Sequence, residues 1–264
     1  MSPLFRRKAA AERTFAQSWA SAERDLYVPP GQQPRTQRQF TKRGHAQTFR
    51  AYVPEGARRS LEIGAGRGTI SRYLVDDGLD VTLLDIEPGA IDIARENFGA
   101  IPATFVVGDV YTSQFEEPFD VILSLGLLEH LADIPGLLAK VYTLLKPGGR
   151  FITYNAPLKW SMQRLVNWVY DRPDYHREDL PLDKCLDLMR AAGFSVVDAF
   201  HYNPFPIFNT QLLNRRRPIT PQTEQFITRA YLLLARLRGK HYMKTNRIVG
   251  MGYIVVADKP ADRA

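Results

Sequence analysis

A glycine-rich turn at residues 64–68 holds the residue types best suited to ligand binding in this chain. The three residues before it, Leu61–Ile63, have the apolar character of a buried strand, and Thr69 opens a stretch with helical spacing. A strand, a glycine turn and a helix in this order bring backbone N–H groups to a ligand at the start of the helix. Glycine permits positive φ angles and close approach of the backbone. The turn therefore predicts a ligand-binding site.

The details of the turn favour a cationic ligand that carries no phosphate. The dinucleotide fingerprint Gly-x-Gly-x-x-Gly would need its third glycine where this chain has Thr69. Glu62, at the end of the strand, would repel a phosphate but can accept a hydrogen bond from an ammonium or hydroxyl group. S-adenosylmethionine, a sulfonium compound, meets both conditions. Alternatively, an acid at this place serves only to orient the turn.

The elements that must position the turn alternate between strands and helices. Strands are predicted at 59–63, 80–85, 103–107, 119–124, 150–154, 194–202 and 251–257. Helices are predicted at 8–26, 37–52, 68–76, 88–98, 134–145, 158–170, 181–192 and 221–238. The 134–145 helix is expected to stop at Pro147-Gly148-Gly149. Strands that alternate with helices at this spacing predict an α/β fold with a parallel sheet covered on both faces.

Composition limits the class of protein. At 264 residues, one domain with insertions is the simplest count. The single cysteine, Cys185, excludes an internal disulfide and favours a reducing compartment. No apolar run approaches the ~20 residues that span a bilayer, and no apolar signal core follows the basic N-terminus. We therefore expect a cytoplasmic protein, with peripheral membrane contact as an addition.

Charge is distributed unevenly along the chain. Residues 1–50 hold 10 Lys/Arg and 3 Asp/Glu, residues 51–200 hold 14 and 22, and residues 201–264 hold 11 and 3. An acidic central part is thus flanked by two basic segments. Such flanks suit nucleic acid, an anionic membrane surface or an acidic substrate, and a merely solvated surface is the plain alternative.

Five separated motifs follow one another along the chain: Leu61–Gly68, Leu84–Ile86, Gly108–Val110, residues 119–131 and Leu144–Arg150. Their order and spacing resemble those of the class I S-adenosylmethionine-dependent methyltransferases, in the small-molecule branch that includes the ubiquinone-pathway O-methyltransferases. The resemblance covers about residues 59–200 and resumes at 251–257. It implies a Rossmann-like, seven-stranded, mostly parallel sheet of order 3-2-1-4-5-7-6 with strand 7 antiparallel. A helical N-terminal cap and a large insertion between strands 6 and 7 would be added to it.

The resemblance implies S-adenosyl-L-methionine as cofactor and assigns contacts to it. Asp85 would bond the ribose hydroxyls, Asp109 the adenine amine, and the glycine turn would approach the methionine part. The full set is Glu62, Gly64, Ala65, Gly66, Gly68, Asp85, Ile86, Asp109, Val110, Ser124 and Leu125. Acids at the position of Asp85 also occur in dinucleotide binders, and Asp109 can simply cap a turn.

A general base is useful if the acceptor of the methyl group is a hydroxyl. His130 is the candidate, because it follows strand four and its ordinary pKa suits proton transfer near neutral pH. A histidine bonded to the neighbouring helix or to Glu129 is the equal alternative. Gly126 stands where some relatives have the first glutamate of a metal-binding Glu-x-x-Glu-His, so no metal is predicted.

The segments around the cofactor motifs are expected to choose the acceptor. We expect a helical cap at 1–56 and a methyltransferase domain at 57–264, with acceptor or lid segments at about 156–180 and 203–249. These segments are rich in large apolar groups, which favours a small apolar or lipid-linked acceptor methylated on oxygen, or on carbon or nitrogen. The basic amphipathic helix at 221–238 suits contact with an anionic membrane, or packing on the domain or on a second copy in a homodimer.

Two other functions fit parts of the sequence. The basic flanks would suit an RNA methyltransferase, although they contain no recognised RNA-binding module, which makes nucleic acid the weaker partner. A protein that binds S-adenosylmethionine without turning it over would carry the same cofactor motifs, because fold does not fix function.

Overall fold

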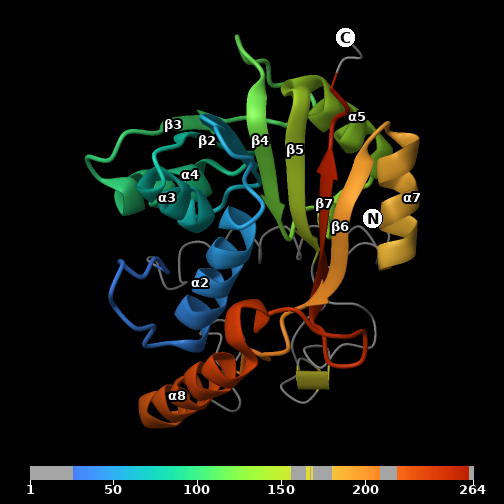
Figure 1. The fold of residues 1–264 in the computed structure, drawn as a ribbon. Coiled ribbons are helices and arrows are strands. Elements are labelled where there is room, and N and C mark those ends of the chain that lie inside the picture. Colours follow the sequence, from blue (N-terminus) through green and yellow to red (C-terminus); the bar gives the residue numbers. More distant parts are fainter. Residues whose placement is uncertain (1–25, 156–164, 167, 169–179, 209–218, 262–264) are drawn as a thin grey trace, which may run out of the picture.

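The computed structural model describes residues 26–155, 165, 166, 168, 180–208 and 219–261. Its centre is one seven-stranded sheet of order β3-β2-β1-β4-β5-β7-β6 (Figure 1). The strands are β1 Arg59–Ile63, β2 Asp80–Asp85, β3 Thr104–Val107, β4 Phe119–Leu125, β5 Leu145–Asn155, β6 Ser195–Tyr202 and β7 Gly252–Asp258. Strands β1 to β5 are mutually parallel, and β7 runs antiparallel to both β5 and β6. The predicted fold and strand order are confirmed.

Helices lie on both faces of the sheet. They are α2 Gln37–Arg50, α3 Thr69–Asp76, α4 Pro88–Phe98, α5 Ile134–Leu144, α7 Leu182–Ala191 and α8 Pro221–Arg238, with 3-10 turns η1 Leu128–His130 and η2 Gly239–His241. Neighbouring strand residues pack into hydrophobic cores on opposite faces of the sheet, because side chains alternate along a strand. Leu83 packs toward α3 and α4, whereas Leu84 packs with α5 on the other side. No helix in the described part of the chain has the length and apolar character of a membrane span.

Local signals in the sequence account for where the helices begin. Pro88 occupies the first turn of α4, where its missing N–H costs no helical bond. The Asp133 side chain accepts from the Gly136 N–H at the start of α5, and Thr220 accepts from the Thr223 N–H at the start of α8. These caps explain why both helices start within a residue of their predicted positions.

Strand β5 begins earlier than predicted. The stretch Pro147-Gly148-Gly149 was expected to separate the α5 helix from a strand at 150–154, but it lies inside β5. Leu145 already pairs with Phe119 across an irregular register, and the Gly148 N–H donates to the Lys259 carbonyl at 2.9 Å. Pairing on both sides therefore overrode the turn signal. The predicted helices at 8–26 and 158–170 lie mostly outside the described residues.

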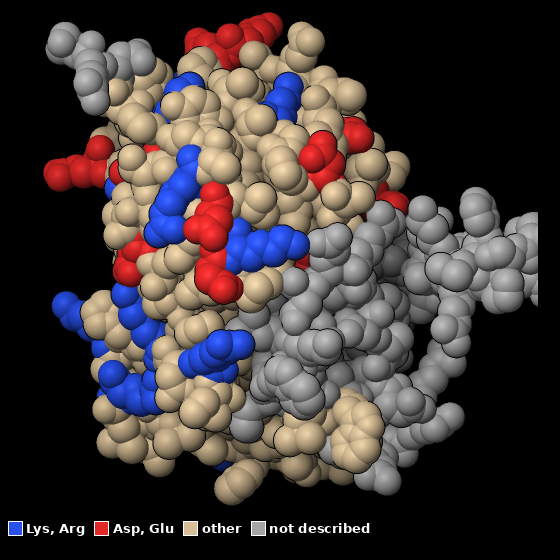
Figure 2. Space-filling model, turned by 90° about the vertical axis from the view of Figure 1, so that its right-hand side faces the viewer, with Lys and Arg blue, Asp and Glu red and all other residues tan. Residues whose placement is uncertain are grey.

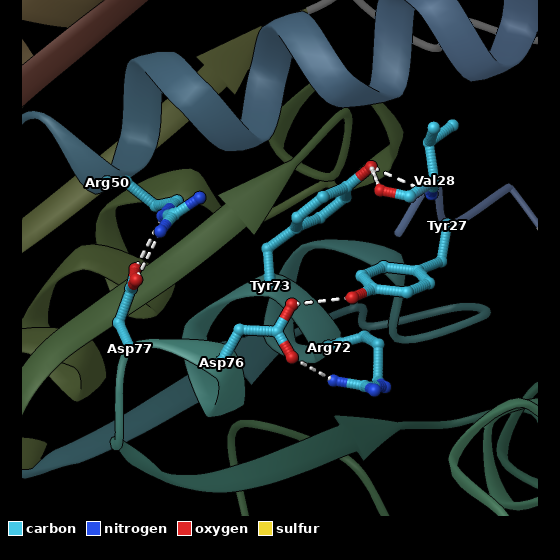
Figure 3. A network of polar contacts seen from close by, with 7 residues as sticks. All are labelled: Tyr27, Val28, Arg50, Arg72, Tyr73, Asp76 and Asp77. Atoms are coloured by element: carbon cyan, nitrogen blue, oxygen red, sulfur yellow. Dashed lines mark hydrogen bonds and ion pairs between the residues drawn. The ribbon is translucent and has the colours of Figure 1, made fainter. Parts of the chain in front are cut away.

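The N-terminal segment is anchored on α3 by a polar network (Figure 3). The Tyr27 hydroxyl donates to Asp76 at 2.6 Å, and the Tyr73 hydroxyl accepts from the Val28 N–H at 2.9 Å. The Arg50 guanidinium forms a two-pronged ion pair with Asp77. These bonds hold α2 and the residues before it against the helix that the glycine turn opens.

Candidate functional site

The glycine turn connects β1 to α3 in a left-handed backbone conformation. The φ angles of Gly64 and Gly66 are +63° and +56°, a region that side chains with a Cβ rarely adopt. A Cβ on Gly64 would also lie 3.0 Å from a methyl group of Leu127. Glycine at both positions therefore permits the backbone conformation of the turn, and at Gly64 it also avoids contact with Leu127.

Asp85 at the end of β2 holds the turn from the neighbouring strand. Its Oδ2 atom accepts from the Gly66 N–H at 2.8 Å, and its Oδ1 atom accepts from the Glu87 N–H at 3.0 Å. Burial raises the pKa of this carboxyl, while the N–H bonds from Glu87 and Gly66 act in the opposite direction. The carboxylate thus lies fixed between the turn and the start of α4, with its remaining lone pairs available for hydroxyl donors.

Glu62 ties β1 to α3. Its Oε2 atom accepts both the Ser71 N–H at 3.0 Å and the Ser71 hydroxyl at 2.6 Å. Burial raises its pKa, and the two bonds from Ser71 oppose that shift. Glu62 therefore holds α3, the helix that follows the turn, and it also lines a small cavity of about 80 Å³ beside Gly64 and Gly66.

A larger cavity of about 510 Å³ opens at the carboxyl ends of β1, β2 and β4. Ligands of open parallel sheets bind at this edge. Predicted residues that line it are Gly64, Asp85, Ile86, Asp109, Val110, Leu125 and His130. Glu62, Gly64, Ala65, Gly66 and Leu125 line the small cavity, so Gly64 and Leu125 belong to both. The structure thus places nearly all of the predicted set at two cavities that share Gly64 and Leu125.

Ile86 and Asp109 differ in how far their side chains are already engaged. Ile86 is 64% exposed at the cavity, an unusual position for a large apolar side chain, and a flat ligand group would cover it. Asp109 accepts the Tyr111 N–H at 2.9 Å through Oδ1, and its carbonyl accepts from Ser113. Asp109 thus does cap a turn, and its Oδ1 bond leaves the second carboxylate oxygen for another donor.

Two predicted residues lie outside both cavities. Gly68 begins α3 with φ +66°, and a Cβ there would lie 2.3 Å from a Leu83 methyl group. Ser124 is fully buried, and its hydroxyl lies 3.0 Å from the Thr153 hydroxyl between β4 and β5. Their contacts in the structure are packing and strand pairing.

Lys42 of α2 belongs to the site and was missed in the sequence. It lines the small cavity together with Glu62 and the glycine turn. Burial lowers the pKa of its ammonium group to about 8, while the Glu62 charge raises it. The sequence placed Lys42 on a helix but gave no sign of which side of α2 meets the turn, because that depends on tertiary packing.

His45, one turn further along α2, lies in an aromatic pocket. Its ring centroid is 4.6 Å from that of Tyr154 and 5.2 Å from that of Tyr202. Burial, with the Lys42 charge adding to it, lowers its pKa well below the ordinary value, so the imidazole is neutral at pH 7. Its Nδ1 atom has no hydrogen-bond partner within the described part of the chain. His45 thus places a neutral imidazole near the carboxyl end of β5.

Comparison with known proteins agrees with this geometry. Residues 61–153 match the methyltransferase domain family. A ubiquinone biosynthesis O-methyltransferase from Ruegeria pomeroyi is 31% identical over 57% of this chain and 66% of its own length. One from Xylella fastidiosa is 32% identical over 45% of this chain, and the matched part is half (50%) of its own length.

The fold is shared with a solved S-adenosylmethionine-dependent methyltransferase from Archaeoglobus fulgidus, with a TM-score of 0.56 and 18% identity. That match covers 84% of this chain and 94% of the other. At this identity the likeness concerns the fold alone. The motifs, the matched domain and the sequence relatives together place this chain in the class I S-adenosylmethionine-dependent methyltransferases, which take their methyl group from S-adenosyl-L-methionine.

Proposed function

We propose that this chain transfers a methyl group from S-adenosylmethionine to a small apolar or lipid-linked acceptor, on an oxygen atom in the first instance. The observation that carries the proposal is the cavity of about 510 Å³ that Asp85, Asp109 and the glycine turn share. Its volume lies in the range of small-molecule sites, about 300–1,000 Å³. The two sequence relatives described above are O-methyltransferases, which supports oxygen as the methylated atom.

The residues present fit the cofactor group by group. Asp85 offers carboxylate lone pairs for ribose hydroxyls, and Ile86 offers an exposed apolar surface for adenine. Glu62 and Lys42, of opposite charge, line the small cavity and suit the ammonium and carboxylate of the methionine part. When bound, the cofactor supplies an activated methyl group on a sulfonium. The chain's own task is then to align the acceptor, exclude water and accept a proton.

Replacing Lys42 with methionine is expected to weaken S-adenosylmethionine binding about 10-fold, the loss of one charge-assisted bond. The wild-type advantage should shrink as the pH rises through about 8, because Lys42 loses its charge there. Lys42→Arg should retain the advantage above that pH, since arginine stays protonated. Titration calorimetry across this pH range measures all three proteins. An affinity that is equal in wild type and Lys42→Met at neutral pH contradicts the assignment.

Replacing His130 with asparagine is expected to lower turnover by about 10²- to 10⁴-fold, with cofactor affinity almost unchanged. The reason is its position on η1 at the cavity wall, where it can take the acceptor proton. His241, exposed on η2, gives a matched control. His45→Asn distinguishes the two candidate bases, and a loss of turnover there but not in His130→Asn would transfer the role to His45.

The acceptor can be found with extracted metabolites and lipids and a radiolabelled methyl donor. Transfer of label to an apolar product supports the proposal, and transfer only to RNA would support the alternative raised by the basic flanks. Tight cofactor binding with no labelled product in any extract would favour a binding protein.

For the architecture we propose a cap at 1–56 and acceptor segments at about 156–180 and 203–249.

A further inference from the structure

Helix α8 packs on the protein with one face and exposes a row of apolar side chains on the opposite face. Thr228 and Tyr231 are buried against the body of the protein, and the Tyr231 hydroxyl donates to the Pro206 carbonyl at 2.7 Å. On the opposite side Phe226, Leu233 and Leu237 recur at spacings of seven and four residues, which aligns them along the helix. Phe226 and Leu237 are 73% and 76% exposed.

Other exposed large apolar side chains accompany this outer stripe in the described part of the chain. Seven of the ten large apolar side chains that are exposed in the described part of the chain belong to α8, to residues 165 and 168, or to the turn before β7. Figure 1 shows α8 and the helical turn at 165–166 at the same lower end. The seven are Leu165, Trp168, Phe226, Leu233, Leu234, Leu237 and Ile248.

The charge around the stripe is positive. Arg229 and Arg236 flank it and form no ion pair within the described residues, and Arg238 and Lys240 follow. The one acidic residue of α8, Glu224, accepts from the Gln37 N–H on the buried side. Figure 2 shows a neighbouring face on which the lower part, at the end that carries α8, displays basic side chains, whereas the upper part displays acidic and basic side chains together.

A groove beside the stripe adds hydrogen-bond donors. It has a volume of about 670 Å³ and lies between residues 32–35 and α8. Arg35 and Arg229 line it, together with Gln32, Gln33 and Gln225. Guanidinium and amide groups are suited to phosphate oxygens. The surface thus presents apolar side chains for acyl chains and donors for anionic headgroups.

We propose that the outer face of α8 docks on an anionic phospholipid surface. Amphipathic helices with basic flanks bind at the headgroup level through apolar insertion and attraction to anionic lipid. A second copy apposed through this face would place Arg229 and Arg236 against like charges, and a nucleic acid would leave Phe226 and Leu237 in water. Lipid binding by this face is separate from methyl transfer and can be measured without turnover.

Co-sedimentation tests this with vesicles of phosphatidylcholine alone and with phosphatidylglycerol added. Wild type should pellet with the mixed vesicles only, and less at 1 M than at 0.1 M salt, where the Debye length falls from about 10 Å to about 3 Å. The Arg229→Glu/Arg236→Glu variant should partition onto the mixed vesicles at least about 25-fold less than wild type, because each lost arginine costs about fivefold. Phe226→Ser/Leu237→Ser should also lose binding.

Matched controls are Lys140→Glu/Arg190→Glu on α5 and α7 and Val197→Ser on β6, where Lys140 is partly exposed and Arg190 and Val197 are exposed. They should pellet like wild type. Failure of wild type to pellet, equal binding to both vesicles, or loss of binding in the controls overturns the proposal. So does a wild-type dimer in size-exclusion chromatography that Phe226→Ser/Leu237→Ser converts to monomer, since the face would then join two copies.

Discussion

Replacing Asp85 with alanine should weaken S-adenosylmethionine binding by about 100-fold or more. The carboxylate accepts the Gly66 and Glu87 N–H groups, so its loss frees the glycine turn as well as removing the proposed ribose contact. Hydrogen bonds to a charged group contribute about 1.5–3 kcal/mol each, and each 1.4 kcal/mol is tenfold in affinity. Titration calorimetry gives the affinity directly.

Asp80, exposed at the other end of β2, supplies the matched control as Asp80→Ala. That variant should bind the cofactor like wild type. The cofactor affinity of Asp85→Asn should lie between those of wild type and Asp85→Ala. Its amide retains one acceptor oxygen but turns a donor toward a backbone N–H. If Asp85→Ala and Asp80→Ala bind with the same affinity, the cavity at β2 is not the cofactor site.

Replacing Gly68 with alanine should destabilise the fold by about 2–5 kcal/mol and leave the site chemistry intact. The added Cβ would lie 2.3 Å from a Leu83 methyl group and 3.0 Å from the Phe98 ring, in a left-handed conformation. The conformation costs about 1–2 kcal/mol and overpacking a further ~1–3 kcal/mol. Thermal unfolding should show Tm lower by roughly 5–15 °C.

Gly78→Ala separates the two causes. Gly78 has φ +83°, and nothing lies within 4 Å of the position of its Cβ, so only conformational strain applies. Its Tm should fall by roughly 2–8 °C. Saturating cofactor should still raise the Tm of Gly68→Ala, because a ligand that binds the native state stabilises it. If Gly68→Ala has the wild-type Tm but has lost affinity for the cofactor, Gly68 contributes to cofactor binding and not to packing alone.

The sequence predicted the parallel sheet and its binding edge well because both depend on local patterns. Buried runs such as 119–124 and the glycine turn leave signals within a few residues. The strand ends then converge by topology, which brought Asp85, Asp109 and His130 to one cavity. Glu62 was ambiguous in the sequence, and only its two bonds from Ser71 show that it orients α3.

What the sequence could not show depends on how elements meet. The approach of Lys42 to the turn depends on the packing of α2 on α3, and no residue near Lys42 encodes that contact. The same holds for β5, where pairing with Phe119 and Lys259 drew Pro147-Gly148-Gly149 into the strand. The pattern of α8 predicted an amphipathic helix, but not that an exposed apolar stripe lies opposite the buried one.

The place of β7 in the sheet has a consequence for the order in which the chain folds. In the seven-stranded sheet of the described residues, β6 is an edge strand whose one neighbouring strand is β7, and β7 lies between β6 and β5. During synthesis β5 must therefore keep an open edge until residues 252–258 have left the ribosome, a period in which unpaired strand edges invite aggregation. Amide protons of β6 and β7 should accordingly exchange as one cooperative unit, separate from the strands that hold the glycine turn.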